Sequence, residues 1–237
     1  MVVTGYDWVG NNENKTELWP RPDSQCALPD FPLKVMNAVG FWTAQGPTVC
    51  GGDGGGKKCF IYKEHQWMPW TNMRKARIDA SAIQINPNQA LIIGGYDENH
   101  NDLKTSELIS SSGSKIGKKK QLFWPRPTIY SHCAFPFNAT HAIVTGGVQD
   151  GSISANTWFV DLATTSFSPG PTMKTKRQDH GCSIFQHGTK SYGIVSGGNK
   201  FEKYDRERLN STEMIDFGQG SPKWTEGMQD KSKIVYL

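Results

Sequence analysis

The chain has 237 residues, a formal net charge of +4 and a mean hydropathy of −0.55. Its hydrophobic content of 36% reaches the ordinary globular range once its 25 glycines are added, and its length permits one large domain or two small ones. No stretch of about 18 consecutive apolar residues occurs, which excludes a membrane-spanning helix. The small net charge gives no reason to expect nucleic-acid binding, and the lysine-rich stretch 115–120 is interpreted as a solvated loop. No charged segment followed by an apolar core is visible at the start, so no signal peptide is recognised.

Short β-branched runs that end in glycine recur along the chain, about every 50 residues. Each run is followed by a polar loop and a further short strand, and three of these strands open alike, around Glu17, Glu107 and Glu213. The runs are Val2–Gly5, Thr48–Gly52, Leu91–Gly95, Ile143–Gly147 and Ile194–Gly198. This pattern predicts many short antiparallel strands and no helix.

Aromatic and proline residues follow most of these strand pairs, and a basic residue then begins the next unit, as at Arg77 and Arg177. A sheet of four short strands has two apolar faces, which are buried only when several such sheets stack around an axis. The sequence therefore predicts an all-β protein of five four-stranded repeats. Their approximate ranges are 1–33, 34–73, 74–128, 129–173 and 174–228.

The order of apolar run, Gly-Gly, polar loop, strand and Trp/Pro segment resembles the kelch repeat over the whole chain. The resemblance implies a single kelch-type β-propeller over residues 1–237. One departure is Tyr6, which stands where a second glycine is expected. The segments around Thr16–Pro20 and Cys26–Pro32, together with Val49–Gly52 and Cys59, resemble more narrowly a group of secreted invertebrate kelch-like proteins.

The frame of the repeats leaves two arrangements open. The chain starts on the second strand of a repeat, and residues 229–237 have the pattern of an inner strand that would complete the first repeat. Such a strand would close a five-bladed ring. Alternatively, the chain is a fragment of a six- or seven-bladed ring.

The loops between second and third strands are expected on the same face as the links between repeats. Loops on a rigid scaffold are the usual binding surface, with arginines as anchors. The candidate binding residues on this face are Asp53, Arg74, Arg77, Asp97, Arg126 and Arg177. The alternative for Arg77 and Arg177 is structural, with each pairing to a neighbouring blade, because they recur at equivalent positions.

The five cysteines are interpreted separately. Cys50 ends one strand and Cys59 begins its antiparallel partner, which favours a disulfide, with two buried thiols as the alternative. Cys133 and Cys182 fall on the inner strands of consecutive repeats, which are expected to stand too far apart for a bond. Cys26 has no evident partner.

We expect no cofactor and no metal. The six histidines lack a four-ligand arrangement, and the loop 97–102 lacks the spacing of a calcium-binding loop. Residues Gly51–Lys57 imitate a phosphate-binding loop, but Lys58 replaces the required Ser or Thr and a strand follows in place of a helix.

Three N-glycosylation sequons begin at Asn14, Asn138 and Asn210, in or beside predicted turns. With the predicted disulfide they favour an extracellular or lumenal chain. The alternative is a cytoplasmic one.

Three functions remain open. The first is a non-catalytic module whose polar loop face binds a protein or a glycan, because no nucleophile, base and orienting group recur at a recognisable spacing. The second, implied by the kelch resemblance, is a propeller enzyme of the galactose-oxidase-like or sugar-isomerase kind. The third is an intracellular kelch adaptor that presents substrates to a ubiquitin ligase.

Overall fold

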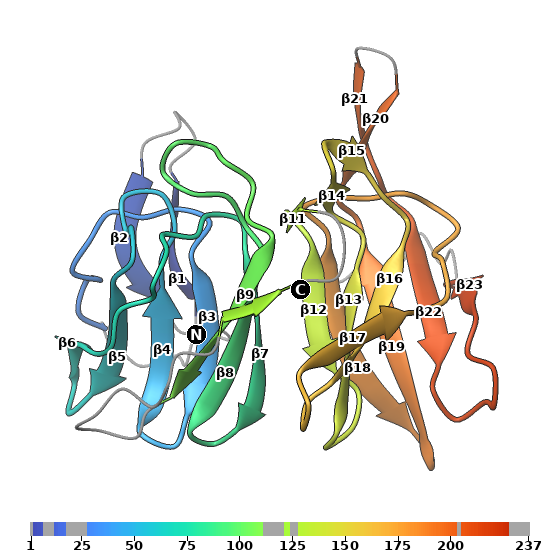
Figure 1. Cartoon of the computed structure of the whole chain (residues 1–237), viewed down its shortest axis with the longest axis horizontal. Coiled ribbons are helices and arrows are strands. Elements are labelled where there is room, and N and C mark those ends of the chain that lie inside the picture. Colours follow the sequence, from blue (N-terminus) through green and yellow to red (C-terminus); the bar gives the residue numbers. More distant parts are fainter. Residues whose placement is uncertain are drawn as a thin grey trace. The chain divides into compact units, whose positions relative to one another are not determined.

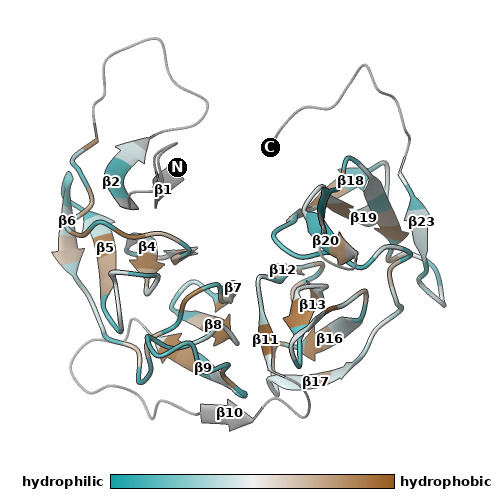
Figure 2. Ribbon diagram, turned by 90° about the horizontal axis from the view of Figure 1, so that it is seen from above, coloured by the Kyte–Doolittle hydropathy of each residue, from teal (hydrophilic) through white to brown (hydrophobic). Residues whose placement is uncertain are grey.

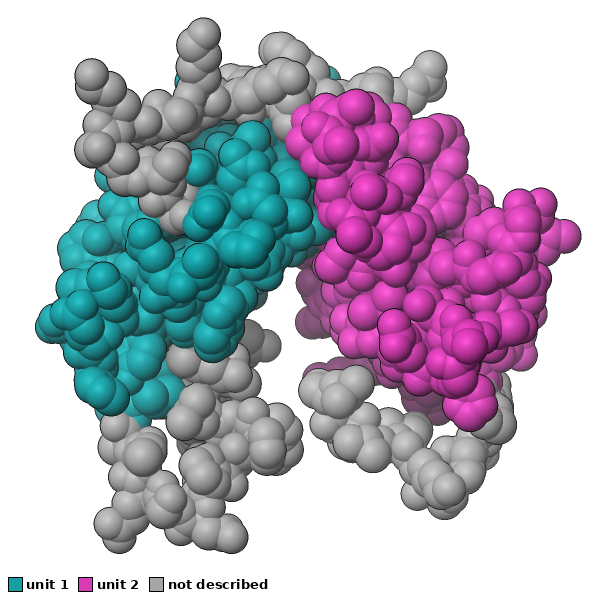
Figure 3. Space-filling model, turned by 90° about the horizontal axis from the view of Figure 1, so that it is seen from below, with its two compact units in different colours: residues 1–123 teal, residues 124–237 magenta. Residues whose placement is uncertain are grey.

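The structure is a computed structural model that describes residues 2–6, 12–17, 28–110, 121–123, 128–202 and 205–227. All regular elements in these ranges are β-strands, as predicted, and all pairings between them are antiparallel (Figure 1). Two compact units are distinguished, residues 1–123 and 124–237, coloured separately in Figure 3.

The first unit contains two four-stranded meanders and a strand pair. The strand pair is β1 (Val2–Tyr6) with β2 (Asn12–Glu17). One meander has the order β3 (Val39–Thr43), β4 (Gly46–Cys50), β5 (Cys59–Lys63) and β6 (Gln66–Pro69). The other consists of β7 (Ser81–Asn86), β8 (Gln89–Ile93), β9 (Thr105–Ser110) and β10 (Gln121–Phe123).

The second unit contains two further meanders and two small sheets. One meander consists of β12 (Cys133–Pro136), β13 (His141–Thr145), β16 (Thr157–Asp161) and β17 (Ser166–Pro169). The other consists of β18 (Gly181–His187), β19 (Lys190–Ser196), β22 (Thr212–Asp216) and β23 (Trp224–Glu226). The small sheets are β11 (Ile129–Tyr130) with β14 (Val148–Gln149) and β15 (Ser152–Ile153), and β20 (Asn199–Glu202) with β21 (Asp205–Arg208).

The predicted repeats 34–73, 74–128, 129–173 and 174–228 each coincide with one meander. Of the repeat 1–33, only the strand pair and residues 28–33 are described, and the predicted closing strand 229–237 lies outside the described residues.

The second strands β8 and β13 are the most deeply buried strands of their units among the described residues. Leu91, Ile92 and Ile93 of β8 are fully buried, as are Ala142–Val144 of β13, which Figure 2 shows as an apolar strand. Consecutive residues of a strand point to opposite faces, so an unbroken apolar run means that both faces of the sheet are covered. Met73 and Met173, from the links, complete the clusters between neighbouring sheets of each unit.

Trp67 on β6 and Trp224 on β23 are also buried, as expected for aromatic residues that fill the space between sheets.

Candidate functional site

In the four repeats that the structure describes as meanders, a backbone bridge holds the connection between the second and third strands against the link. In each case the residue after Gly-Gly, in the connection between second and third strands, pairs with the link that precedes the inner strand. The pairs are Met36 with Asp53, Ile78 with Tyr96, Tyr130 with Val148, and Gln178 with Asn199. The prediction that these connections share a face with the links is therefore confirmed within each unit. We use "loop face" below for these connections and links.

The glycine pairs make this close approach possible. Gly52 and Gly147 have φ of 81° and 79°, which side-chain-bearing residues rarely adopt. A Cβ at Gly147 would lie 2.5 Å from Tyr130 O, and one at Gly52 would lie 2.6 Å from Met36 O. Each of these glycines donates its backbone N–H to a carbonyl oxygen in the link of the next repeat: Gly52 to Arg77 O and Gly147 to Arg177 O. The Gly-Gly signal therefore joins consecutive repeats within each unit.

Arg77 and Arg177 do not belong to the exposed binding surface. Their exposed fractions are 1% and 0%, so neither guanidinium reaches a partner. The interpretation of these two residues as binding anchors was wrong, and the structural alternative is correct with one amendment. Each arginine pairs within its own repeat, with Glu107 and Glu213 respectively, and not with a neighbouring blade.

Both arginines form the same network. Arg77 donates to the carbonyl oxygens of Gly94 and Thr105, at 2.6 and 2.7 Å, and lies 3.3 Å from Glu107 Oε1. Arg177 donates in the same way to Gly197 and Ser211, with its Nη2 2.9 Å from Glu213 Oε1. Burial lowers the pKa of Arg77, and the Glu107 carboxylate opposes that shift.

The two glutamates also organise the links. Glu107 accepts the backbone N–H groups of Arg74 and Lys75, and Glu213 accepts those of Lys174 and Thr175. Each carboxylate thus connects the third strand to the link and the link arginine. This is the physical reason for the Glu that opens the third strand in these repeats.

The intervening repeats use an apolar solution at the same positions. In the repeat 34–73, strand register places Val35 at the position of Arg77 and Phe60 at the position of Glu107. In the repeat 129–173, the same two positions hold Ile129 and Trp158. Val35 and Phe60 lie in one apolar cluster with Phe31 and Trp67. The four described meanders therefore alternate between an ion pair and apolar residues at this position.

The remaining predicted binding residues differ in exposure. Arg74 and Asp53 are exposed, whereas Asp97 is half-buried and Arg126 lies outside the described residues. Asp97 Oδ1 accepts the backbone N–H groups of Asn99 and Asn101. The hydrogen bond from Asn101 is the main reason that the pKa of Asp97 is lowered. Asp97 therefore shapes its own loop.

The most prominent part of the loop face is the connection of the last described repeat, which extends as the β20–β21 hairpin beyond the sheet of its unit (Figure 1). Phe201 on β20 is 47% exposed, and Arg206–Arg208 are exposed on β21. The sequence predicts a loop over this stretch, and Phe201 is not among the predicted binding residues. An available signal was Phe201 itself, an aromatic residue within the otherwise mostly charged stretch 200–208.

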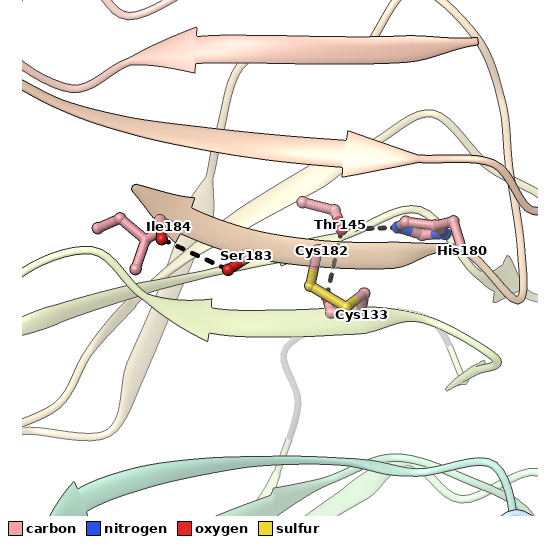
Figure 4. Close-up of a disulfide and its surroundings, with 6 residues drawn as sticks. All are labelled: Cys133, Thr145, His180, Cys182, Ser183 and Ile184. Atoms are coloured by element: carbon pink, nitrogen blue, oxygen red, sulfur yellow. Dashed lines mark hydrogen bonds between the residues drawn. A yellow bond between two sulfur atoms is a disulfide. The ribbon is translucent and has the colours of Figure 1, made fainter. Parts of the chain in front are cut away.

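Two disulfides stabilise the chain. Cys50 and Cys59 are bonded across β4 and β5, where they are directly paired, as the sequence favoured. Cys133 and Cys182 are bonded across β12 and β18, with a Cα–Cα distance of 6.0 Å (Figure 4). The expectation that these inner strands stand too far apart was wrong. In a fold whose sheets stack around an axis, the innermost strands of consecutive sheets are where those sheets converge.

Two buried histidines flank this inter-sheet bond. His180 Nε2 lies 2.8 Å from Thr145 Oγ1, and that hydroxyl donates to Cys133 O at 3.3 Å (Figure 4). Burial lowers the pKa values of both His132 and His180 to about 3. Both imidazoles are therefore uncharged at neutral pH. Among the residues that the structure describes, no group of three or more His, Cys, Asp or Glu side chains is placed to hold a metal ion.

The three sequons lie at different degrees of exposure. Asn138 and Asn210 are exposed, and Asn14 is half-buried on β2. Asn138 Oδ1 accepts hydrogen bonds from the backbone N–H groups of Thr140 and His141, which closes the turn between β12 and β13. Within the described ranges, no helix is long and apolar enough to cross a membrane.

Comparison with known proteins supports the fold. No protein-family model matches the chain, and no curated protein matches its sequence. Among solved structures, the chain is similar to that of YjhT, with a TM-score of 0.68 and 15% identity over 87% of this chain and 68% of YjhT. At this identity the likeness shows the fold alone, which is all-β and β-propeller-like.

Proposed function

We propose that this chain is a kelch-type β-propeller that acts as a non-catalytic interaction module and binds a protein or a glycan partner through its loop face. The observation that carries the proposal is the backbone bridge that fixes each connection to its link. Fixed connections lose little conformational freedom on binding, which favours affinity. Exposed charged and aromatic side chains, among them Asp53, Arg74 and Phe201, stand on these fixed segments.

An extracellular or lumenal location forms part of the proposal. Two disulfides engage four of the five cysteines, and such bonds persist mainly in oxidising compartments. Exposed sequons at Asn138 and Asn210 agree with that location. Extracellular proteins and glycans are therefore the partners to screen first.

The proposal is tested by screening the purified chain against arrays of glycans and extracellular proteins and then measuring direct binding to each hit. Asp53→Lys and Arg74→Glu change the charge of the loop face. Gln45→Glu is the matched control, because Gln45 is exposed in the β3–β4 turn, at the opposite end of its sheet. A hit that the loop-face variants weaken by about tenfold, and that Gln45→Glu retains, supports the proposal. Hits that all variants bind equally would contradict it.

A further inference from the structure

The β20–β21 hairpin has two chemically different faces. Residues paired across two antiparallel strands share a face, and alternate residues change face. Phe201 pairs with Arg206 and Asn199 pairs with Arg208, so these four residues lie on one face. Lys200 and Glu207 lie on the other, where their charged groups are 3.1 Å apart. We call Phe201, Arg206 and Arg208 the aromatic–arginine face.

The base of the hairpin is rigidly attached to the repeat. Asn199 and Gln178 exchange backbone hydrogen bonds of 3.0 Å, and Leu209 N donates to Gly198 O at 2.9 Å. Asp179 Oδ2 also accepts from Asn199 Nδ2, at 3.0 Å. The hairpin is thus presented in one orientation before any partner binds, which reduces the entropy lost on association.

The charges of this face are only partly paired within the described chain. Arg206 Nη2 is 3.7 Å from Asp179 Oδ2, and the Arg206 side chain remains 58% exposed. Arg208 is exposed and forms no ion pair with any described residue. Two guanidinium groups with one carboxylate at their base leave a net positive face beside an aromatic ring that is 47% exposed.

We propose that the aromatic–arginine face of the β20–β21 hairpin binds an acidic peptide segment of a partner protein, an inference that rests on the proposed interaction-module function. Guanidinium groups bind carboxylates with two parallel hydrogen bonds, and arginine clusters recur in the recognition of acidic motifs. The exposed Phe201 ring offers apolar contact to a partner, and a peptide with alternating acidic and apolar side chains can use both that ring and the arginines. Two arginines are too few for a nucleic-acid backbone.

The test uses the whole chain and a fluorescent synthetic peptide of alternating glutamate and leucine. The matched probe replaces every glutamate with glutamine, and heparin represents an anionic glycan. We expect the glutamate peptide to bind, the glutamine peptide to bind at least about tenfold more weakly, and added salt to weaken the binding. Arg208→Glu and Phe201→Ala should each weaken it by about tenfold.

Lys200→Glu is the control, because it makes the same change of charge on the opposite face of the same hairpin. It should leave the peptide affinity within about twofold. Phe201 and Arg208 are exposed, so thermal unfolding of their variants should match that of the unchanged chain. The Lys200 side chain is 20% exposed and lies 3.1 Å from Glu207, so NMR of the free Lys200→Glu variant should first show the same β20–β21 pairing. NMR shift mapping of the peptide complex should place the largest changes on β20 and β21.

Several results would overturn the inference: equal affinity for both peptides, equal losses in Lys200→Glu and Arg208→Glu, or a hairpin that binds heparin and not the glutamate peptide. If Arg74→Glu weakened the binding of a partner while Arg208→Glu and Phe201→Ala left that binding unchanged, the inference would be overturned. The interaction-module function would still stand. If no loop-face variant changed the binding of any partner, both this inference and the proposed interaction-module function would be contradicted.

Discussion

The two units solve the same packing problem with different chemistry. Strand register places Ala38 and Ala80 of the first unit at the positions of His132 and His180 in the second. It likewise places Val39 and Ala82 at the positions of Cys133 and Cys182. The first unit therefore joins its inner strands by apolar contact, whereas the second uses a disulfide flanked by buried imidazoles.

The contrast shows that the fold fixes the geometry of the inner strands but not the means of holding them. The features common to both units are those that the backbone requires, namely the Gly-Gly bend and a link arginine paired with a strand glutamate. The features that differ are side-chain contacts between neighbouring sheets. We expect removal of a shared feature to lower stability by a similar amount in either unit. Removal of a feature that only one unit has should lower the stability of that unit alone.

The largest expected effect comes from the shared ion pair. Glu107→Ala and Glu213→Ala each leave a buried guanidinium and two backbone N–H groups without their acceptor, and each should lower the free energy of unfolding by about 3–5 kcal/mol. Denaturant titration measures the loss, and Glu226→Ala, at an exposed position, is the control. A loss in one unit and none in the other would show that the two networks are not equivalent.

Removal of a disulfide should have the next largest effect on the free energy of unfolding, and this effect should differ between the two units. The sequence separation is 49 residues for Cys133–Cys182 and 9 for Cys50–Cys59. The loop-entropy relation gives about 4 kcal/mol for the longer loop and about 3 kcal/mol for the shorter one. Replacing each pair with alanine and measuring unfolding tests this order, with hydrogen exchange of β12 and β18 as a local readout. Greater destabilisation from losing Cys50–Cys59 would contradict it.

Acid should destabilise the second unit selectively. The pKa values of His132 and His180 are about 3 in the folded chain, below the ordinary value of about 6.5. The unfolded chain therefore binds more protons between these values, so stability is complete above pH ~6.5 and falls as the pH decreases towards 3. At pH 5 the loss is about 2 kcal/mol for each imidazole.

Hydrogen exchange measured against pH should show this loss in β12 and β18 and not in β3 and β7. The double variant His132→Ala with His180→Ala, which introduces the first unit's residues, should flatten the pH dependence. An unchanged pH profile in that variant would assign the acid sensitivity to other groups.

The last prediction concerns glycosylation and the oxidation state of the cysteines. It has the smallest expected effect on stability, and it tests the proposed compartment. If the proposed location is right, the intact mass of the protein from its natural source should decrease on glycan removal. One of the five cysteines should alkylate before reduction, because the two disulfides engage the other four. Mutation of Asn138 to Gln should remove one glycan. An unmodified chain with five alkylatable thiols would refute the extracellular proposal.

Local sequence patterns determined the repeats, the meanders and the direct pairing of Cys50 with Cys59, because strand alternation and glycine turns act over a few residues. The same local information placed Arg77 and Arg177 at equivalent positions but did not distinguish a buried guanidinium from an exposed one. Their burial depends on Glu107 and Glu213, which lie 30 and 36 residues away in sequence.

The sequence by itself thus determined which strands form the meanders, where they turn and which connections share a face. Only the tertiary structure decided which charges are buried, which cysteines meet across sheets and which connection extends as a hairpin with an exposed aromatic ring. The physical reason is the range of the interactions: backbone geometry is set by neighbours in the chain, whereas burial and the Cys133–Cys182 contact depend on the approach of strands from different repeats.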